Sequence, residues 1–457
     1  MKEKISLFVI GFIIGALIST FAYFVNNKIL TNNNEMISIN GQMGNPNGNM
    51  PEQMGENSNS IEYSGVEEIT EDTTIESGEY LSENADENAI LVTGKIKSNL
   101  SNITVNKTGD SEGGDNTSFY GINSGIIAKN GANLILKNIT VATDAKGANG
   151  VFSYGGSATT NNSSSDGTTI EISDSKITTQ KDNSGGVMAT GGGILNVSNV
   201  IVDTAGISSA AIRTDRGGAT VTVNGGTYTT SGQGSPSVYS TADITINDAS
   251  LISKASEGIV IEGKNSVTIN NCDLTDNNTK LNGLSTSYKN IFLYQSMSGD
   301  ADTGNSEFTA KDSTITTNNG DTFYITNTSS TINLNNNTII NNDSNGNFLR
   351  AKADSWGNNG ANGGDVTLVL NNQKIEGNIV IDSISKLDMS LESNSYYEGI
   401  INADNTASNI NLKLDETSSI KLKGDSYITS LESKDTTYNN IDLNGYKLYV
   451  NGVEFKK

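Results

Sequence analysis

The sequence predicts an all-β protein, a right-handed parallel β-helix solenoid with three short strands in each coil. Pairs of apolar residues recur with a fixed gap of five positions, from Leu136 and Val141 to Leu443 and Leu448. In every pair, the second residue after the first member is Asn, Asp or Gly, the types that best tolerate a left-handed backbone. A further apolar run precedes each pair, and one unit spans about 21 to 36 residues, a normal length for a solenoid repeat.

Two sets of positions define the predicted coils. The bends between the second and third strands are expected at Asn138, Asp174, Asn199, Gly225, Asp248, Asn271, Asp312, Asn336, Asn372 and Gly445. The first strands are expected to begin at Ile126, Val151, Val187, Ile212, Val238, Ile259, Ile291, Phe323 and Phe348. Stacked bends should align their Asn side chains in a ladder, and right-handed winding follows from the general chirality of parallel crossovers.

Two features of the predicted solenoid depart from strict repetition. Long insertions are expected at one corner only, near residues 153–168, 295–307 and 351–365, and such loops often form the binding side of a solenoid. After Ile375 the coils become regular and polar-faced, and their last strand edge must be capped against aggregation.

The N-terminal segment predicts a membrane anchor. Residues 1–4 form a short stub with two lysines, followed by an uncharged, largely apolar run that begins at Ile5 and ends at Val25. A helix of that length crosses the roughly 30 Å hydrocarbon layer, and the lysines place the stub in the cytoplasm. The expected localisation is therefore the cell membrane, with one transmembrane signal-anchor helix and an extracytoplasmic C-terminal domain. A cleaved signal peptide is the alternative, although its apolar region usually holds only about 7 to 15 residues.

The composition of the chain indicates where the folded domain lies and which kinds of function are excluded. Residues 26–64 are rich in Asn, Gly and Met and predict a flexible linker, so the β-helix domain is assigned to residues 65–457. Only 34% of the chain is apolar, with 48 glycines and 3 prolines, which suits many short strands joined by tight turns.

The absence of histidine excludes serine triads, cysteine–histidine dyads and histidine-ligated zinc. The net charge of −22 argues against a nucleic-acid partner.

Several segments resemble a family of uncharacterised, adhesin-like right-handed β-helix proteins on the surface of Gram-positive bacteria, which share the pectate-lyase-like fold. The segments are SAAIRTDRGGATVTVNGGTY, SPSVYSTADITI, SEGIVIEGKNSVTI, YQSMSGDADTGNSEF, FYITNTSSTINL, WGNNGANGGDVTL and GDSYITSL, within residues 80–452. The resemblance implies an exported, adhesive or glycan-binding protein and supplies no catalytic residues.

The outward positions of the first strands form the candidate ligand site. In-register stacking turns scattered side chains into one strip about 4.8 Å per step. The strip residues are Arg213, Asp215, Tyr239, Glu262, Phe292, Tyr294 and Tyr324, with Trp356 added from a long loop. Aromatic faces and charged rims suit an extracellular polysaccharide or a host or cell-wall surface. The alternative is that the protein's own long loops cover this strip.

Two further chemistries are considered. Arg213, Asp215 and Arg216, with Glu257, Glu262 and Lys264 two coils later, allow either a polysaccharide lyase or hydrolase or a structural ion-pair ladder. Asp300, Asp302 and Asn305 weakly resemble a calcium loop, and no other cofactor is expected. The favoured function is a non-catalytic, adhesin-like or glycan-binding surface protein, with an enzyme or a structural cell-envelope protein as the alternatives.

Overall fold

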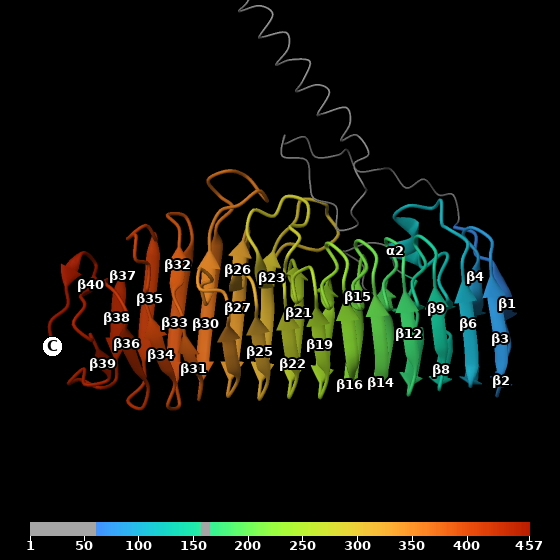
Figure 1. Cartoon of the computed structure of the whole chain (residues 1–457), viewed down its shortest axis with the longest axis horizontal. Coiled ribbons are helices and arrows are strands. Elements are labelled where there is room, and N and C mark those ends of the chain that lie inside the picture. The colour runs from blue at the N-terminus through green and yellow to red at the C-terminus, as the bar shows by residue number, and fades with distance from the viewer. Residues whose placement is uncertain (1–60, 157–164) are drawn as a thin grey trace, which may run out of the picture. The chain divides into compact units, whose positions relative to one another are not determined.

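The computed structural model describes residues 61–156 and 165–457. The predicted stub, the predicted anchor at residues 5–25 and most of the predicted linker lie outside these residues. Within the described part, the helix α2 (Asn116–Tyr120) is short, and no helix there is long and apolar enough to cross a membrane. The described chain is otherwise a stack of parallel strands, which begins at β1 and ends near the C-terminus at β40 and β41 (Figure 1).

The first strands of the coils form one 12-stranded sheet. Its members are β1 (Gly65–Ile69), β4 (Asn88–Thr93), β7 (Ile126–Lys129), β10 (Val151–Tyr154), β13 (Val187–Thr190), β15 (Ile212–Thr214), β17 (Val238–Ser240), β20 (Ile259–Glu262), β23 (Lys289–Tyr294), β26 (Asp321–Thr326), β29 (Leu349–Ala351) and β32 (Ile379–Ile381). Each neighbouring pair is parallel.

The second and third strands together form a 22-stranded sheet, because β14 and β16 continue through the bend that separates them in the other coils. The second strands are β2 (Thr73–Ile75), β5 (Lys97–Ser101), β8 (Asn133–Lys137), β11 (Thr169–Ser173), β14 (Gly193–Thr204), β16 (Ala219–Thr230), β18 (Asp243–Asn247), β21 (Ser266–Asn270), β24 (Asn305–Lys311), β27 (Thr328–Asn335), β30 (Gly364–Asn371), β33 (Lys386–Glu392), β35 (Asn409–Leu414) and β38 (Ser430–Ser433). The separate third strands are β3 (Gly78–Ser82), β6 (Ile103–Lys107), β9 (Thr140–Thr143), β12 (Lys176–Thr179), β19 (Ser250–Ser253), β22 (Asp273–Asp276), β25 (Thr314–Thr317) and β28 (Thr338–Asn341).

Two small sheets complete the C-terminal end. The third-strand row continues as the 4-stranded sheet of β31 (Lys374–Glu376), β34 (Tyr396–Gly399), β36 (Ser419–Leu422) and β39 (Ile441–Asp442). The last sheet has 3 strands, β37 (Ser426–Ile428), β40 (Leu448–Val450) and β41 (Val453–Glu454). Strand β41 turns back antiparallel to β40, and the Phe455 ring packs 5.2 Å from the Tyr438 ring. This hairpin ends the parallel ladder, as expected for a capped edge.

All ten predicted bend positions have a left-handed backbone, with φ between 47° at Asn372 and 83° at Gly445. Nine of them lie between second and third strands, whereas Gly445 follows β39 of the third-strand row and precedes β40. Their side chains form parts of the expected ladder. Asn199 Nδ2 donates to Asp174 Oδ1 at 2.9 Å, and Asn336 Nδ2 donates to Asp312 Oδ1 at 2.6 Å. The chain therefore turns at the same place in successive coils, and several of these bends are joined side chain to side chain.

Inward apolar residues stack in register to form one continuous core. Ile126 pairs with Val151 and Val151 with Val187, and the same column continues to Phe323. The predicted start at Phe348 is wrong by one residue, because Phe323 pairs with Leu349. Arg350 therefore points outward rather than into the core, and its Nε donates to Asp321 Oδ2 at 2.6 Å.

Length variation is not confined to one corner, contrary to the sequence prediction. Loops before the first strands also vary, notably residues 108–125, which contain α2, and residues 277–288 before β23. The bend between the second and third strands keeps a constant length from β2 to β31 and is one residue longer before β34, because Glu392 pairs with Asn371 while Tyr396 pairs with Lys374. Both corners that vary flank the 12-stranded sheet, so long loops can reach over its outer face from either side.

The bend at Asn271 offers a test of the left-handed constraint. Its φ is 51° and its Nδ2 donates to Asp248 Oδ1 at 2.6 Å. Asn271→Ala should lower the free energy of unfolding by about 1–2 kcal/mol, because a Cβ-bearing residue without a polar side chain is strained there. Asn271→Gly is the control and should cost less, since glycine adopts this backbone freely. Urea denaturation followed by circular dichroism measures both, and equal losses would contradict the assigned strain.

Candidate functional site

The strip of outward first-strand residues is buried, which corrects the expectation of a solvent-facing ligand strip. Glu262, Tyr324 and Trp356 are 0% exposed, and Tyr239, the most exposed aromatic, is 9% exposed. Trp356 comes from the loop after β29, and its ring lies 5.2 Å from Phe292 and 5.5 Å from Tyr294. The alternative considered from sequence, that the protein's own loops cover the strip, is the one that the structure bears out.

Helix α2 and its flanking loop cover the N-terminal part of the same face. Ile127, Phe152 and Met188 are each 0% exposed. A Cβ at Gly121 would lie 2.6 Å from the Phe152 ring, so this glycine allows the loop to approach closely. The guanidinium of Arg216 lies 4.1 Å from the Phe119 ring centre. These contacts fasten α2 to the stack.

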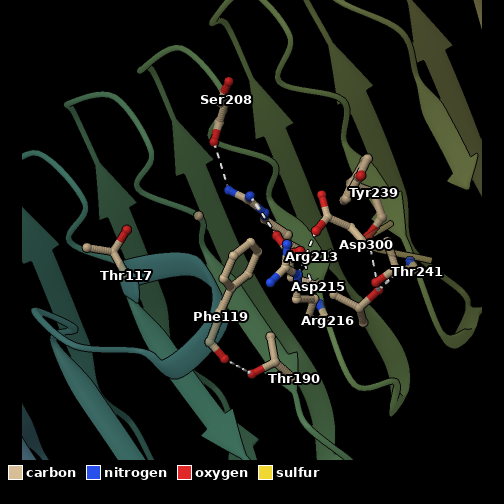
Figure 2. Close-up of polar contacts among 12 residues, drawn as sticks. Thr117, Phe119, Thr190, Ser208, Arg213, Asp215, Arg216, Tyr239, Thr241 and Asp300 are labelled. Atoms are coloured by element: carbon tan, nitrogen blue, oxygen red, sulfur yellow. Dashed lines mark hydrogen bonds and ion pairs between the residues drawn. The ribbon is translucent and has the colours of Figure 1, made fainter. Parts of the chain in front are cut away.

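A buried ionic network joins the covering loops to the strip (Figure 2). Arg213 donates through Nη2 to Asp215 Oδ2 at 2.9 Å and through Nη1 to the Ser208 carbonyl at 3.0 Å. Arg216 donates through Nε to Asp300 Oδ1 at 2.7 Å, which joins the turn after β15 to the loop after β23. Burial raises the pKa of Asp215 to about 7, while Arg213 opposes the rise. The network is internal, because Arg213 and Asp215 are 2% and 3% exposed.

Glu262 lies under the aromatic residues rather than at an open rim. Its Oε2 accepts hydrogen bonds from Tyr239 Oη at 2.6 Å and from Tyr294 Oη at 2.8 Å. Burial raises the pKa of Glu262 and the pKa of both tyrosines. A carboxyl group in this position joins its own coil to the coils on both sides and has no access to a polymeric substrate.

A buried lysine that was not predicted from the sequence lies beneath the aromatic residues of the strip. Lys289 is 0% exposed, with its Nζ 4.4 Å from the Phe292 ring centre and 3.8 Å from Glu257 Oε1. Burial lowers its pKa, against the pull of Glu257. Tyr324 Oη donates to Asp354 Oδ2 on the loop that carries Trp356. Lys289 lies two residues before Ile291, the predicted start of an apolar strand. This position is the one signal in the sequence that could have indicated its burial.

The predicted calcium residues have separate partners. Asp300 pairs with Arg216, Asp302 pairs with Lys264 at 2.8 Å, and Asn305 Nδ2 donates to Thr331 Oγ1 at 3.1 Å. Among the described residues, no group of three or more Asp, Glu, Cys or His side chains could hold a metal ion. The calcium interpretation of this loop therefore has no support from the contacts.

A polar groove of about 380 Å³ lies beside the covered strip. It runs along the corner between first and second strands in consecutive coils, where glycines expose the backbone. Its lining includes Gly192, Gly217, Gly218, Thr220, Thr241, Asp243, Lys264, Asn265, Asp300 and Asp302. In contrast, the cavity among Arg213, Tyr239 and Tyr294 has a volume of about 30 Å³, which is room for water rather than for a sugar.

Comparisons with protein-family models, curated proteins and solved structures find no match to this chain.

Trp356 tests whether the cover is part of the folded structure. Trp356→Ala should lower the free energy of local unfolding of this loop by about 3–5 kcal/mol, because removal of a fully buried indole leaves a cavity against Phe292 and Tyr294. We expect faster proteolysis within residues 352–363, while the strand content measured by circular dichroism stays unchanged. Trp356→Phe, which keeps an aromatic ring, is the matched control. Unchanged proteolysis of the alanine variant would show that the loop does not depend on this contact.

Proposed function

We propose that this protein is a membrane-anchored, right-handed parallel β-helix that binds polysaccharide at the cell surface without catalysis. Right-handed winding is proposed from the chirality of parallel crossovers, and an experimental structure with a left-handed path would contradict it. The extracytoplasmic location rests on the apolar run at residues 5–25 and on the lysines before it.

The observation that supports glycan binding best is the groove of about 380 Å³. This volume lies within the usual range of about 300–1,000 Å³ for ligand sites. Corner residues of successive coils line it at steps of about 4.8 Å, so a ligand with repeating units can make the same contact several times. Hydroxyl, amide and carboxylate groups, and backbone exposed at glycines, suit a polyhydroxylated chain.

The contacts favour binding over catalysis. A glycosidase generally needs two carboxyl groups that reach the sugar from either side. Here Asp300 pairs with Arg216 and Asp302 pairs with Lys264, while Asp243 accepts a hydrogen bond from Ser266 Oγ at 2.7 Å. The lyase alternative would need a free arginine base, yet Arg213 is buried against Asp215.

Thr220 provides a test of the groove. It is an exposed residue of β16 that lines the groove, so Thr220→Trp should fill the groove without touching the core. A microarray of neutral, acidic and amino polysaccharides probed with the full-length protein identifies the best glycan. We expect Thr220→Trp to weaken binding to that glycan by about tenfold or more, or about 1.4 kcal/mol.

The matched control is Thr222→Trp, two positions along the same strand and outside the groove, which should bind like the unmodified protein. Equal losses in the two variants would place the site elsewhere. Binding to no glycan would favour a structural cell-envelope role, and release of new reducing ends or unsaturated products would favour an enzyme.

Cell fractionation tests the proposed anchor. The full-length protein should remain in the membrane pellet after washing with high salt and with alkaline carbonate, because a spanning helix is not released by either treatment. Deletion of residues 5–25 should remove it from the pellet. Recovery from the medium of a protein whose N-terminus follows this segment would show a cleaved signal peptide instead.

A further inference from the structure

The third strands end in a column of polar residues that stack in register. The column consists of Ser82, Lys107, Thr143, Thr179, Thr204, Thr230, Ser253, Asp276, Thr317 and Asn341. Its members donate hydrogen bonds at the corner that follows. Thr143 Oγ1 donates to the Ala148 carbonyl at 2.9 Å, and Ser253 Oγ donates to the Ser256 carbonyl at 2.9 Å. Asp276 is the exception, because an ionised carboxylate can only accept.

Four oxygens at this corner are buried without a hydrogen bond of good geometry: both carboxylate oxygens of Asp276, Oδ1 of Asn278 and Oδ1 of Asn290. The backbone N–H of Asn278 is directed at the Asp276 carboxylate. All three residues are 0% exposed. Their amide nitrogens are already used, since Asn278 Nδ2 donates to the Lys289 carbonyl at 3.0 Å and Asn290 Nδ2 donates to Thr317 Oγ1 at 3.0 Å. Thr317 is the strand partner of Asp276, so these contacts hold the three side chains around one corner.

Buried acceptors without a donor are costly, and native proteins satisfy nearly all of them. A single proton on Asp276 would give one donor, which can serve one of the other oxygens and leaves two unsatisfied. A cation can be held by several acceptor oxygens at once, which a single proton cannot. The carboxylate of Glu257 also acts electrostatically on Asp276, which adds negative potential beside the Glu257–Lys289 pair.

We propose that Asp276, Asn278 and Asn290 bind a hard metal cation inside the corner between β22 and β23. Carboxylate and amide oxygens, without thiolate or imidazole, select cations such as Na⁺ and Ca²⁺. The cation fastens the loop at residues 277–288, and Leu284 of this loop packs against the covered strip. The site is separate from the groove and does not depend on the proposed glycan binding.

Purified full-length protein, treated with EDTA and exchanged into choline chloride, is titrated with Ca²⁺, Na⁺ or K⁺ while the thermal unfolding midpoint is measured. One of these cations should raise the midpoint saturably. Asp276→Thr introduces the residue type found at Thr317 in the next coil and should abolish the rise in the midpoint. Asp302→Asn, which alters a partly buried acid of the groove, is the control and should keep the response.

Metal content measured by inductively coupled plasma mass spectrometry gives a second readout that does not depend on a variant folding. The protein purified without EDTA should carry close to one equivalent of the active cation. The proposal is overturned if no cation raises the midpoint above its value in choline chloride and the purified protein retains no cation. It is equally overturned if the midpoint only falls as pH rises and Asp276→Asn removes that fall, because a proton then occupies the corner.

Discussion

In-register pairing between neighbouring coils is the constraint on which the other features of this protein depend. Each residue lies beside its counterpart in the next coil, about 4.8 Å away, so any property of one position becomes a column. Apolar residues become a continuous core, Asn and Asp at the bends become a ladder, and outward aromatic residues become a strip. The same rule makes an exception conspicuous: Asp276 stands where its neighbours carry hydroxyl groups.

The parts of the fold that could be predicted from sequence are those set by local rules. A left-handed bend restricts one residue to a few types, and a strand alternates its faces, so nine of the ten bends and the register of eight of the nine first strands follow from spacing. At the ninth, Phe348 and Leu349 are both buried, and apolarity alone could not tell which of them pairs with Phe323.

The candidate site was less predictable, because exposure depends on the path of loops rather than on strand register. The pattern correctly identified the outward aromatic residues and could not show that Trp356 folds back over them. The groove was not predicted either, since glycines and short polar residues at a corner resemble ordinary turns. Arg216 and Asp300 were both noted from sequence, yet their contact spans 84 positions and has no local signature.

Electrostatics explains why the cover is specific. In a chain with 51 acidic and 29 basic residues, Arg213 and Lys289 are nevertheless withdrawn from solvent, each beside a buried acid. Buried ion pairs contribute little net stability, but a cation left without its partner is strongly unfavourable. If the loops closed in another arrangement, these buried charges would lose their partners. The ionic contacts therefore determine which closed arrangement the loops adopt, and add little to its stability.

From β2 to β31, the constant bend between the second and third strands separates a part of each coil that keeps its length from a part that varies. Deleting one residue at that bend would turn a strand over and present its polar side to the core. At the two other corners, chain length already varies from coil to coil without loss of register. The protein is thus a modular scaffold, in which loops over the 12-stranded sheet can be exchanged, lengthened or grafted with new recognition sequences while the two remaining rows of strands keep the stack intact.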